Sequence, residues 1–394
     1  MSMPLEGIRV LDMTTAYSGP VCTLQLADYG AEVIKIERTK YGDAARTWPS
    51  DYEMNPFFVA MNRNKKSISL NLKSEKGKEI FKELVKDADV VVENFRAGVM
   101  ARMGLGYDVL KEINPGIIMA SLCGYGQTGP YSDRSCYSNL AEAMSGILST
   151  TGAPDGMPYG SGVAFGDSVG GMFTLAGILM ALYHREKTGE GQWIDVAMTD
   201  SLFALNEGVA TAVDIQGHDD QRMGNRDPAA YPYDAFEAKD GWCILSVADV
   251  NDWSNFAHAC ELDELVDDPR FKTNNDRCKN ADILWEYITA WSKQHTRDEI
   301  EKRFDENRAG FARINTIGEA MKNEQLLARD MIIEVEDQWF GKIKQNGFPI
   351  KMSTCSAELR CPAPRVGQHN EEYLSKLGYS EADLQALREE GIID

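Results

Sequence analysis

The segment "GIRVLDMTTAYSGPVCTLQLADYGAEVIKIE" (residues 7–37) predicts two buried strands joined by a helix. Residues 7–13 and 31–37 are short, nearly continuous apolar runs, as in parallel strands that are covered on both faces. Residues 19–30 between them are typical of a helix that stops at Gly30. This strand–helix–strand order indicates a parallel sheet with a crossover helix.

The same alternation continues along the chain. Residues 89–95, 116–123 and 192–198 are further short apolar runs, and residues 74–88 have the apolar spacing of an amphipathic helix. Strands and helices that alternate in this way predict an α/β fold built on a parallel sheet. Ligands of such sheets bind at the carboxyl ends of the strands.

A change in composition after the last of these strands suggests a second, smaller domain. A polar stretch with prolines reads as a linker, and a strand at 240–247 begins a mostly helical region. We expect a large domain at 1–217, a linker at 218–236, a small α+β domain at 237–330, and a return to the large domain at 331–394.

Three stretches just past predicted strand ends should face one crevice. They are Arg38, residues 94–96 ("NFR") and residues 124–131 ("GYGQTGPY"). The third fits the pattern G-x-G-x-x-G, but Pro130 follows at once, whereas a dinucleotide-binding loop needs a helix to open inside the motif. We interpret this stretch as a glycine loop that lines an active site with backbone amides.

Composition narrows the class of protein. The net charge of −20 over 394 residues argues against nucleic acid or an anionic membrane as partner. The eight cysteines form no C-x-x-C pair and the five histidines are scattered, which predicts reduced thiols, no metal site and a cytoplasmic protein. We find no secretory signal, and we judge the longest apolar run too short for a membrane span.

Positive charge gathers in one segment of this acidic chain. Residues 35–73 contain eight basic residues against four acidic ones. Such a segment suggests a site for a polyanion such as a phosphate group. A solvated basic loop explains the charge count equally well.

One carboxylate, Asp167, stands alone in "SGVAFGDSVGGMFTLAGILMAL" (161–182). The residues that follow Asp167 in this stretch predict a helix that is apolar on most faces and therefore buried. The simplest role for Asp167 is as the N-cap of that helix. Gly166, Gly170 and Gly171 favour another role, because they would let a ligand approach a carboxylate that acts as a nucleophile.

Seven blocks of the chain, in order, resemble the family III CoA-transferases, the CaiB/BaiF family that includes formyl-CoA and carnitine CoA-transferases. The blocks are "PLEGIRVLDMT", "GPVCTLQLADYGAEVIKIER", "NRNKKSISLNLKSEKGKEIF", "DVVVENFRAGVMARMGLGYDVL", "GYGQTGPY", "GDSVGGMFTLAGILMALYHREKTGEGQWIDVAM" and "PAPRVGQHNEEYLSKLGYS". The resemblance implies an enzyme that exchanges CoA between an acyl-CoA thioester and a carboxylic acid. It also implies a large Rossmann-like domain with a small domain, in an interlocked homodimer.

The resemblance also implies roles for individual residues. Asp167 matches the family's nucleophile, which forms an acyl anhydride and then an aspartyl-CoA thioester. The positions that match CoA-binding residues of the family are Arg38, Leu70, Asn71, Asn94, Phe95 and Arg102. On the substrate side we expect Tyr17, Tyr137 and the loop glycines Gly124 and Gly126.

Departures from the formyl-CoA transferase pattern bear on the substrate. Tyr17 replaces an active-site glutamine, Ser135 replaces a lysine, and the glycine loop that shields the intermediate has no counterpart. These changes speak against formate and oxalate and leave room for a larger acyl group.

Two rival functions remain open on the sequence. An alpha-methylacyl-CoA racemase shares the fold, but it needs two acid/base groups at the alpha carbon and uses a His-Asp pair where this chain has Tyr137-Ser138. A non-catalytic CoA-binding protein is the third reading.

Overall fold

The computed structural model describes residues 3–219, 221–247 and 252–394. Its contacts divide the chain into two units, which we describe separately. Unit 1 contains Met1–Ile147, Gly160–Ala212 and Leu327–Asp394, and unit 2 contains Leu148–Tyr159 and Val213–Leu326. Residue 220, within the stretch expected to be a linker, lies outside the described residues.

Unit 1 is built on a six-stranded sheet with the order β3-β2-β1-β4-β5-β6, in which every pair of neighbours is parallel. Leu11 of β1 lies opposite Ile34 on one side and Val91 on the other. The prediction of an α/β fold with a parallel sheet is confirmed. The strands are β1 (Arg9–Asp12), β2 (Glu32–Glu37), β3 (Lys65–Ser69), β4 (Val90–Glu93), β5 (Ile118–Cys123) and β6 (Trp193–Ala197).

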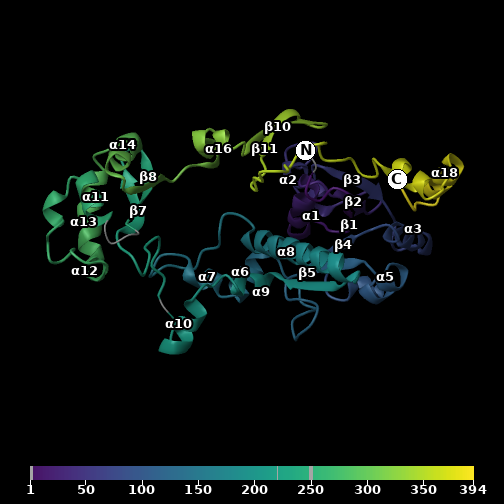
Figure 1. Cartoon of the computed structure of the whole chain (residues 1–394), viewed down its shortest axis with the longest axis horizontal. Coiled ribbons are helices and arrows are strands. Elements are labelled where there is room, and N and C mark those ends of the chain that lie inside the picture. Colours follow the sequence, from purple (N-terminus) through teal and green to yellow (C-terminus); the bar gives the residue numbers. More distant parts are fainter. Residues whose placement is uncertain (1–2, 220, 248–251) are drawn as a thin grey trace. The chain divides into compact units, whose positions relative to one another are not determined.

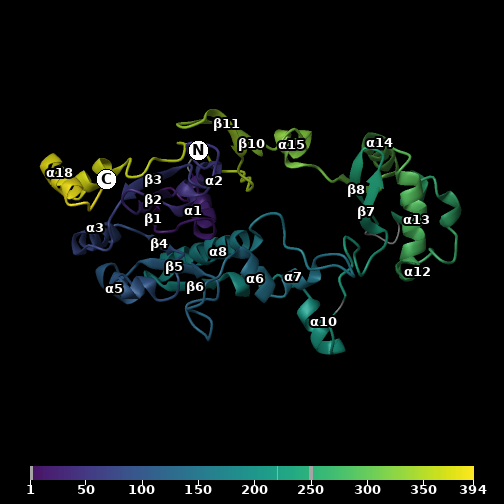
Figure 2. The same ribbon diagram turned by 180° about the vertical axis from the view of Figure 1, so that it is seen from behind.

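Helices cover both faces of this sheet. On one face α1 (Ser18–Asp28) and α8 (Phe165–Thr188) lie side by side (Figures 1 and 2) and pack on the strands through a core cluster that includes Leu26, Val92 and Ile178. The second face is covered by α3 (Glu75–Val85), α5 (Tyr107–Ile113), α17 (Asn370–Lys376) and α18 (Glu381–Glu389).

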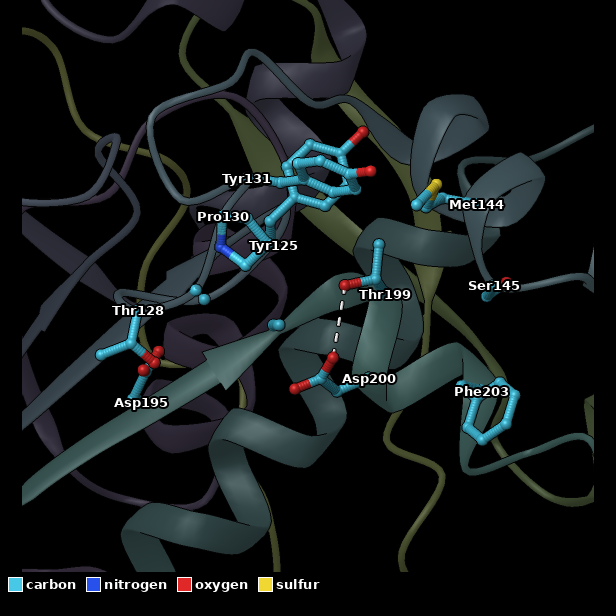
Figure 3. A pocket seen from close by; sticks show the side chains of 13 residues that line it. Tyr125, Thr128, Pro130, Tyr131, Met144, Ser145, Asp195, Thr199, Asp200 and Phe203 are labelled. Carbon is cyan, nitrogen blue, oxygen red and sulfur yellow. Dashed lines mark hydrogen bonds between the residues drawn. The ribbon is translucent and has the colours of Figure 1, made fainter.

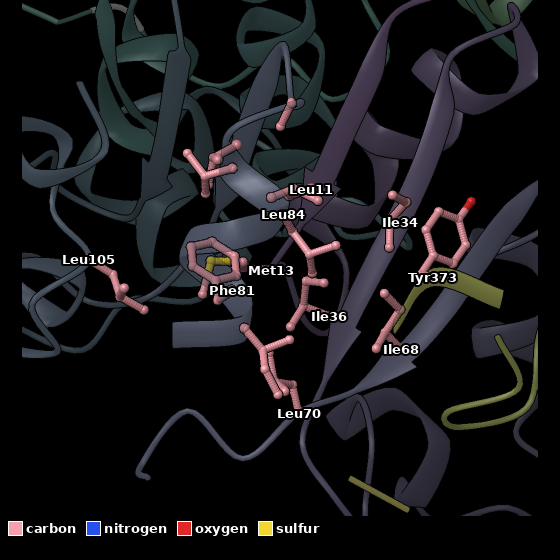
Figure 4. Packing of buried hydrophobic residues seen from close by; sticks show 14 of the residues in the cluster. Leu11, Met13, Ile34, Ile36, Ile68, Leu70, Phe81, Leu84, Leu105 and Tyr373 are labelled. Atoms are coloured by element: carbon pink, nitrogen blue, oxygen red, sulfur yellow. The ribbon is translucent and has the colours of Figure 1, made fainter. Parts of the chain in front are cut away.

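The core of the second face joins distant parts of the chain. Ile34, Ile68 and Phe81 from the first strands and α3 pack with Tyr373 of α17 (Figure 4). Burial of each such side chain stabilises the fold by about 1.5–3 kcal/mol. The last residues of the chain therefore complete the core that the first residues begin.

Helix α8 differs from expectation in two ways. It has 24 residues and is long and apolar enough, by length and composition alone, to cross a membrane, so the expectation that this run is too short was wrong. Thr174 lies inside the continuous helix, and its Oγ1 donates to the carbonyl of Gly170 at 2.8 Å. The helix is also not buried all round, since five large apolar side chains are exposed along it: Met172, Phe173, Leu179, Met180 and Tyr183.

The remaining elements before residue 233, and one hairpin after residue 330, are short. They are η1 (Ala44–Thr47), α2 (Pro56–Met61), α4 (Val99–Arg102), α6 (Ser138–Met144), α7 (Ile147–Thr150), α9 (Met198–Phe203), α10 (Val209–Gln216) and the antiparallel hairpin of β10 (Ile332–Asp337) and β11 (Gly341–Asn346).

Unit 2 holds an antiparallel sheet of β7 (Tyr233–Ala238), β8 (Gly241–Ser246) and β9 (Gly310–Arg313). β7 begins inside the expected linker, because residues 233–238 pair along their whole length with β8. Its helical elements are α11 (Trp253–Ala259), η3 (Asp263–Leu265), α12 (Asn274–Lys279), α13 (Ala281–Ser292), α14 (Arg297–Asn307), α15 (Ile317–Ala320) and α16 (Glu324–Ala328).

Candidate active site

The strand order of the large sheet reverses between β1 and β4, so the loops after these strands border the crevice where ligands of such folds bind. Asn94 joins the two loops. Its Oδ1 accepts from the N–H of Thr15 at 2.9 Å, and its Nδ2 donates to the carbonyl of Thr15 at 2.8 Å and to Ser18 Oγ at 3.2 Å. The side-chain amide of Asn94, expected to bind CoA, is thus engaged within the protein.

Asp167 is the third residue of α8 and does not cap it. The N-cap position is Ala164, whose side chain accepts no hydrogen bond. Ser138 of α6 instead accepts from the N–H groups of Gly166 at 2.8 Å and of Asp167 at 3.4 Å. The N-cap interpretation was therefore wrong, and the carboxylate of Asp167 is left available for chemistry.

The glycines around Asp167 serve packing between elements. A Cβ on Gly171 would lie 2.6 Å from the carbonyl oxygen of Ser18, and one on Gly170 would lie 3.0 Å from Met198. A Cβ on Gly166 would lie 2.9 Å from the carbonyl oxygen of Ser138. These glycines let α8 approach its neighbours closely, whereas the sequence suggested that they expose backbone to a ligand.

Burial is the main influence on the charge of Asp167. It raises the pKa of this carboxyl from 3.8 to about 6, with a hydrogen bond from the Ser18 side chain acting in the opposite direction. The charge of Glu142 raises the pKa further. Glu142 is 4% exposed and accepts from Ser138 Oγ at 2.9 Å. Asp167 is therefore a half-buried carboxylate that is ionised at pH 7.

Tyr17, expected on the substrate side, lies beside the start of α8. Its hydroxyl is 3.0 Å from Oγ of Ser168, the residue after Asp167. Its ring meets that of Phe57 edge-on, with 4.8 Å between the ring centroids. The structure thus brings together Tyr17 and Asp167, which are far apart in the sequence.

The glycine loop after β5 packs closely on the residues before α6. A Cβ on Gly124 would lie 1.9 Å from Cβ of Cys136, so only glycine fits there. Gly126 has a φ of 82°, in the left-handed region that favours glycine. Tyr137, expected to contact substrate, follows Cys136 and is 68% exposed. The helix that a dinucleotide motif would require opens only at Ser138.

A cavity of about 420 Å³ borders this loop (Figure 3). Tyr125 and Tyr131 form one wall, while Asp195 and Asp200 place two carboxylates in the lining. Asp167 does not line it. Because two carboxylates repel an anion, this cavity does not suit a phosphate or carboxylate ligand.

Three more of the side chains expected at the CoA site, those of Arg38, Phe95 and Arg102, differ in their exposure. Arg38 is exposed after β2, and its Nε donates to the carbonyl of Gly42 at 3.3 Å. Arg102 is exposed at the end of α4, and its guanidinium donates to the carbonyl of Ala97 at 3.4 Å. Phe95 is half-buried against the core. Both arginines have donors left for a ligand.

Leu70 and Asn71 are more constrained than expected. Leu70 is 2% exposed and its side chain belongs to the core. Its N–H donates to the carbonyl of Glu37 at 2.7 Å and its carbonyl accepts from the N–H of Leu72 at 3.1 Å, so neither its side chain nor its backbone is left free for a ligand. The Asn71 side chain accepts from the N–H of Lys73 at 3.1 Å and donates to the carbonyl of Gly391 at 3.3 Å.

Half of the basic residues in the 35–73 segment are structural. Their side chains are almost completely buried, and each forms an ion pair with a buried carboxylate. The pairs are Lys35–Asp43, Arg46–Glu37, Arg63–Asp28 and Lys65–Asp12. The charge count in the sequence therefore overstated the cation content available to a polyanion.

Three residues of the site gave no signal in the sequence: Ser18, Ser138 and Glu142. Each is polar and common, and only the packing of α1, α6 and α8 brings them to Asp167. Within the described residues, no group of three or more His, Cys, Asp or Glu side chains could hold a metal ion.

Comparison with known proteins identifies the family of this chain. The model of CoA-transferase family III matches residues 5–370. The chain belongs to CoA-transferase family III. The resemblance seen in the seven sequence blocks, and the enzyme class that it implied, are confirmed.

Relatives and solved structures of the family cover almost the whole chain. The chain is 36% identical to a succinyl-CoA–D-citramalate CoA-transferase of Chloroflexus aurantiacus over 99% of this chain and 98% of the relative. It is 36% identical to a formyl-CoA:oxalate CoA-transferase of Streptomyces coelicolor over 99% of each chain. A CaiB/BaiF family protein from Brucella suis has a similar structure, with a TM-score of 0.87, 33% identity, and coverage of 96% of this chain and 100% of that one.

Proposed function

We propose that this family III enzyme moves CoA from an acyl-CoA to a free carboxylic acid through a covalent intermediate on Asp167. The observation that carries the proposal is that Asp167 is half-buried and is not used as a helix cap, because Ser138 accepts from the N–H groups at the start of α8. Its pKa of about 6 agrees with a carboxylate at neutral pH. A carboxylate in this state can act as a nucleophile.

The reaction follows in two matched halves. Asp167 Oδ attacks the thioester carbonyl carbon and the carbon–sulfur bond breaks. CoA departs as the thiolate, and an acyl–aspartyl anhydride is formed. The thiolate then attacks the aspartyl carbonyl, which releases the donor acid and leaves an aspartyl-CoA thioester. The acceptor carboxylate repeats both steps in reverse and regenerates Asp167. No proton is gained or lost overall.

Exposed cations and the sheet edge support a site for CoA. Arg38 and Arg102 are exposed arginines on the segments that follow β2 and β4, and an arginine binds phosphate through charge-assisted hydrogen bonds. Phe95 offers a half-buried aromatic face on the same loop. We propose these three residues as the CoA-binding set, with Tyr17 and Tyr137 on the acyl side.

We propose a larger acyl group than formyl, of the succinyl type. Support comes from Tyr17 in place of the glutamine of formyl-CoA transferases, since of the two relatives of 36% identity one is named for succinyl-CoA and the other for formyl-CoA. A panel of acyl-CoA donors with dicarboxylate acceptors tests this assignment. Fastest turnover with formyl-CoA would contradict it.

The decisive experiment traps the intermediate. Enzyme quenched in acid during turnover is digested and analysed by mass spectrometry, and we expect an acyl or CoA mass on the peptide that contains Asp167. Asp167→Asn is expected to bind CoA without transfer. A variant with wild-type transfer rates would refute the mechanism, and CoA binding by a wild type without any turnover would favour a binding protein.

The rate should also follow the ionisation of Asp167. Because the carboxylate is the nucleophile and its pKa is about 6, kcat/KM should fall about tenfold per pH unit below pH 6 and level off above pH 7.

A racemase is not favoured, since Ser138, at the position of the second acid/base group of the racemases, is hydrogen-bonded to Gly166 and Glu142.

We further propose a homodimer, in which a second copy covers the apolar stripe of α8. Met180 is 70% exposed and Tyr183 65% exposed on this helix, and exposed apolar stripes mark protein interfaces. Met180→Glu should lower the mass seen by sedimentation equilibrium towards that of one chain. Met157→Glu, which changes an equally exposed methionine outside α8, should leave the mass unchanged. A monomeric wild type would refute the proposal.

A further inference from the structure

A buried carboxylate outside the residues already assigned lies beneath the loop that reaches Asp167. Asp43 is 3% exposed, and its Oδ2 pairs with Nζ of the fully buried Lys35 at 2.8 Å. Its Oδ1 accepts from Thr15 Oγ1 and from the N–H of Ala16, both at 2.9 Å, and from the N–H of Ala45 at 2.8 Å. Asp43 thus binds both the loop after β1 and its own loop after β2.

The loop that Asp43 binds has an unusual backbone. Ala16 has a φ of 67°, which is rare for a residue with a side chain and persists only where neighbours impose it. Lys35 donates to the carbonyl of Thr14 at 2.8 Å, and Asn94 binds both backbone groups of Thr15. Asp43, by binding the Ala16 N–H itself, acts at the strained residue.

The two residues after Ala16 meet the nucleophile. Tyr17 bonds to Ser168, and the Ser18 side chain bonds to Asp167. Because Gly171 of α8 packs against the carbonyl oxygen of Ser18, a small movement of this loop changes the contact with α8 directly. The atoms that contact α8 therefore belong to the two residues that directly follow Ala16, whose N–H Asp43 binds.

Asp43 is also tied to the predicted CoA side. Its N–H donates to Glu37 Oε2 at 2.8 Å, and Glu37 pairs with Arg46 at 2.7 Å. Arg38 bonds to Gly42, the residue before Asp43. These contacts use the backbone of Gly42 and Asp43 and not the Asp43 side chain, so the loop of Arg38 keeps them when that side chain is replaced.

We propose that Asp43 is a positioning residue for the transfer reaction: it holds the loop 14–18 so that Ser18 and Tyr17 meet Asp167 and Ser168. This role rests on the proposed function of Asp167. Asp43 does not contact the reacting atoms, so its loss should lower kcat and leave CoA binding almost unchanged.

The first test compares two buried carboxylates. Asp43→Asn removes the charge that faces Lys35, and Asp28→Asn, as a matched control, removes the charge that faces Arg63 in an equally buried ion pair. We expect kcat to fall about 10²-fold in Asp43→Asn, the loss typical of a misplacement of about 1 Å. CoA affinity, measured by calorimetry, should stay close to wild type, and Asp28→Asn should keep wild-type kcat.

A second pair of variants keeps the test open if Asp43→Asn does not fold. Thr15→Val removes the hydroxyl group that donates to Asp43, and the control variant Thr15→Ser keeps it. We expect Thr15→Val to lower kcat and to speed amide hydrogen exchange of residues 15–18, while Thr15→Ser recovers both.

The outcomes separate this role from the proposed mechanism. Wild-type kcat in a folded Asp43→Asn, or in Thr15→Val, overturns the positioning role while Asp167→Asn remains inactive. An active Asp167→Asn instead overturns the mechanism itself. Equal loss of kcat in Asp28→Asn and Asp43→Asn would show a general effect of buried charge and would also overturn the positioning role.

Discussion

Replacement of the proposed nucleophile should make the protein more stable, by an amount that depends on pH. Burial raises the pKa of Asp167 from 3.8 to about 6, so the folded chain binds this proton more tightly than the unfolded chain does. The protonated Asp167 carboxyl group therefore contributes to the stability of the folded state below pH 3.8, and this contribution is lost as pH rises to about 6. Asp167→Asn removes the group that causes the loss.

The expected gain follows from the two pKa values. One pKa unit corresponds to about 1.4 kcal/mol, so the ionised carboxylate costs about 3 kcal/mol at pH 7.5. At pH 5 the folded state keeps the proton, and the gain should be about half as large. Guanidinium unfolding followed by tryptophan fluorescence, with wild type and Asp167→Asn at both pH values, measures the two gains.

The control variant is Asp133→Asn, which removes one negative charge from an exposed position. It should change the free energy of unfolding by less than about 0.5 kcal/mol at both pH values. Asp167→Asn with no gain at pH 7.5, or with the same gain at pH 5 and pH 7.5, would refute the reasoning that burial strains this carboxylate in the folded chain.

Three further outcomes are expected. Arg38→Ala should weaken CoA binding about tenfold or more in calorimetry, because an exposed guanidinium that binds phosphate is lost; unchanged affinity would remove Arg38 from the site. Gly124→Ala should cost about 1–3 kcal/mol of stability through the contact of its new Cβ with Cys136, and Cys136→Gly in the same chain should recover part of this loss in a thermal melt. Glu93→Gln should stabilise the protein by about 3 kcal/mol at pH 8, because burial raises the pKa of Glu93 from 4.5 to about 7. The free energy of unfolding of the wild type falls as pH rises from 4.5 to 7, so a gain of equal size at pH 4 would contradict this explanation.

The strands that could be predicted are those whose residues are apolar on both faces. β1, β2, β4 and β5 read directly as buried strands, and the order of the elements gave the parallel sheet. β3 ("KKSIS", Lys65–Ser69) could not be predicted in this way. Its first residue, Lys65, is buried because its Nζ donates to Oδ2 of Asp12 at 3.1 Å. No local pattern in the sequence shows a partner 53 residues away.

The site was predicted in part, for a related reason. Asp167 stands out as the only acid in a long apolar run, so sequence and resemblance both point to it. Its neighbours Ser18, Ser138 and Glu142 have no such pattern, because each reaches the site only through helix packing. The N-cap interpretation failed because a serine from another helix occupies that role, which local sequence does not reveal.

The order in which the core is completed has a consequence for synthesis in the cell. The six strands have all been synthesised once Ala197 is added, but Tyr373, Leu374 and Leu384, which complete the cover of one face, follow more than a hundred residues later. At about 5–20 residues per second this delay lasts about 9–35 s. During that time part of the apolar surface of the sheet is uncovered in the nascent chain and is open to chaperones that bind hydrophobic surfaces.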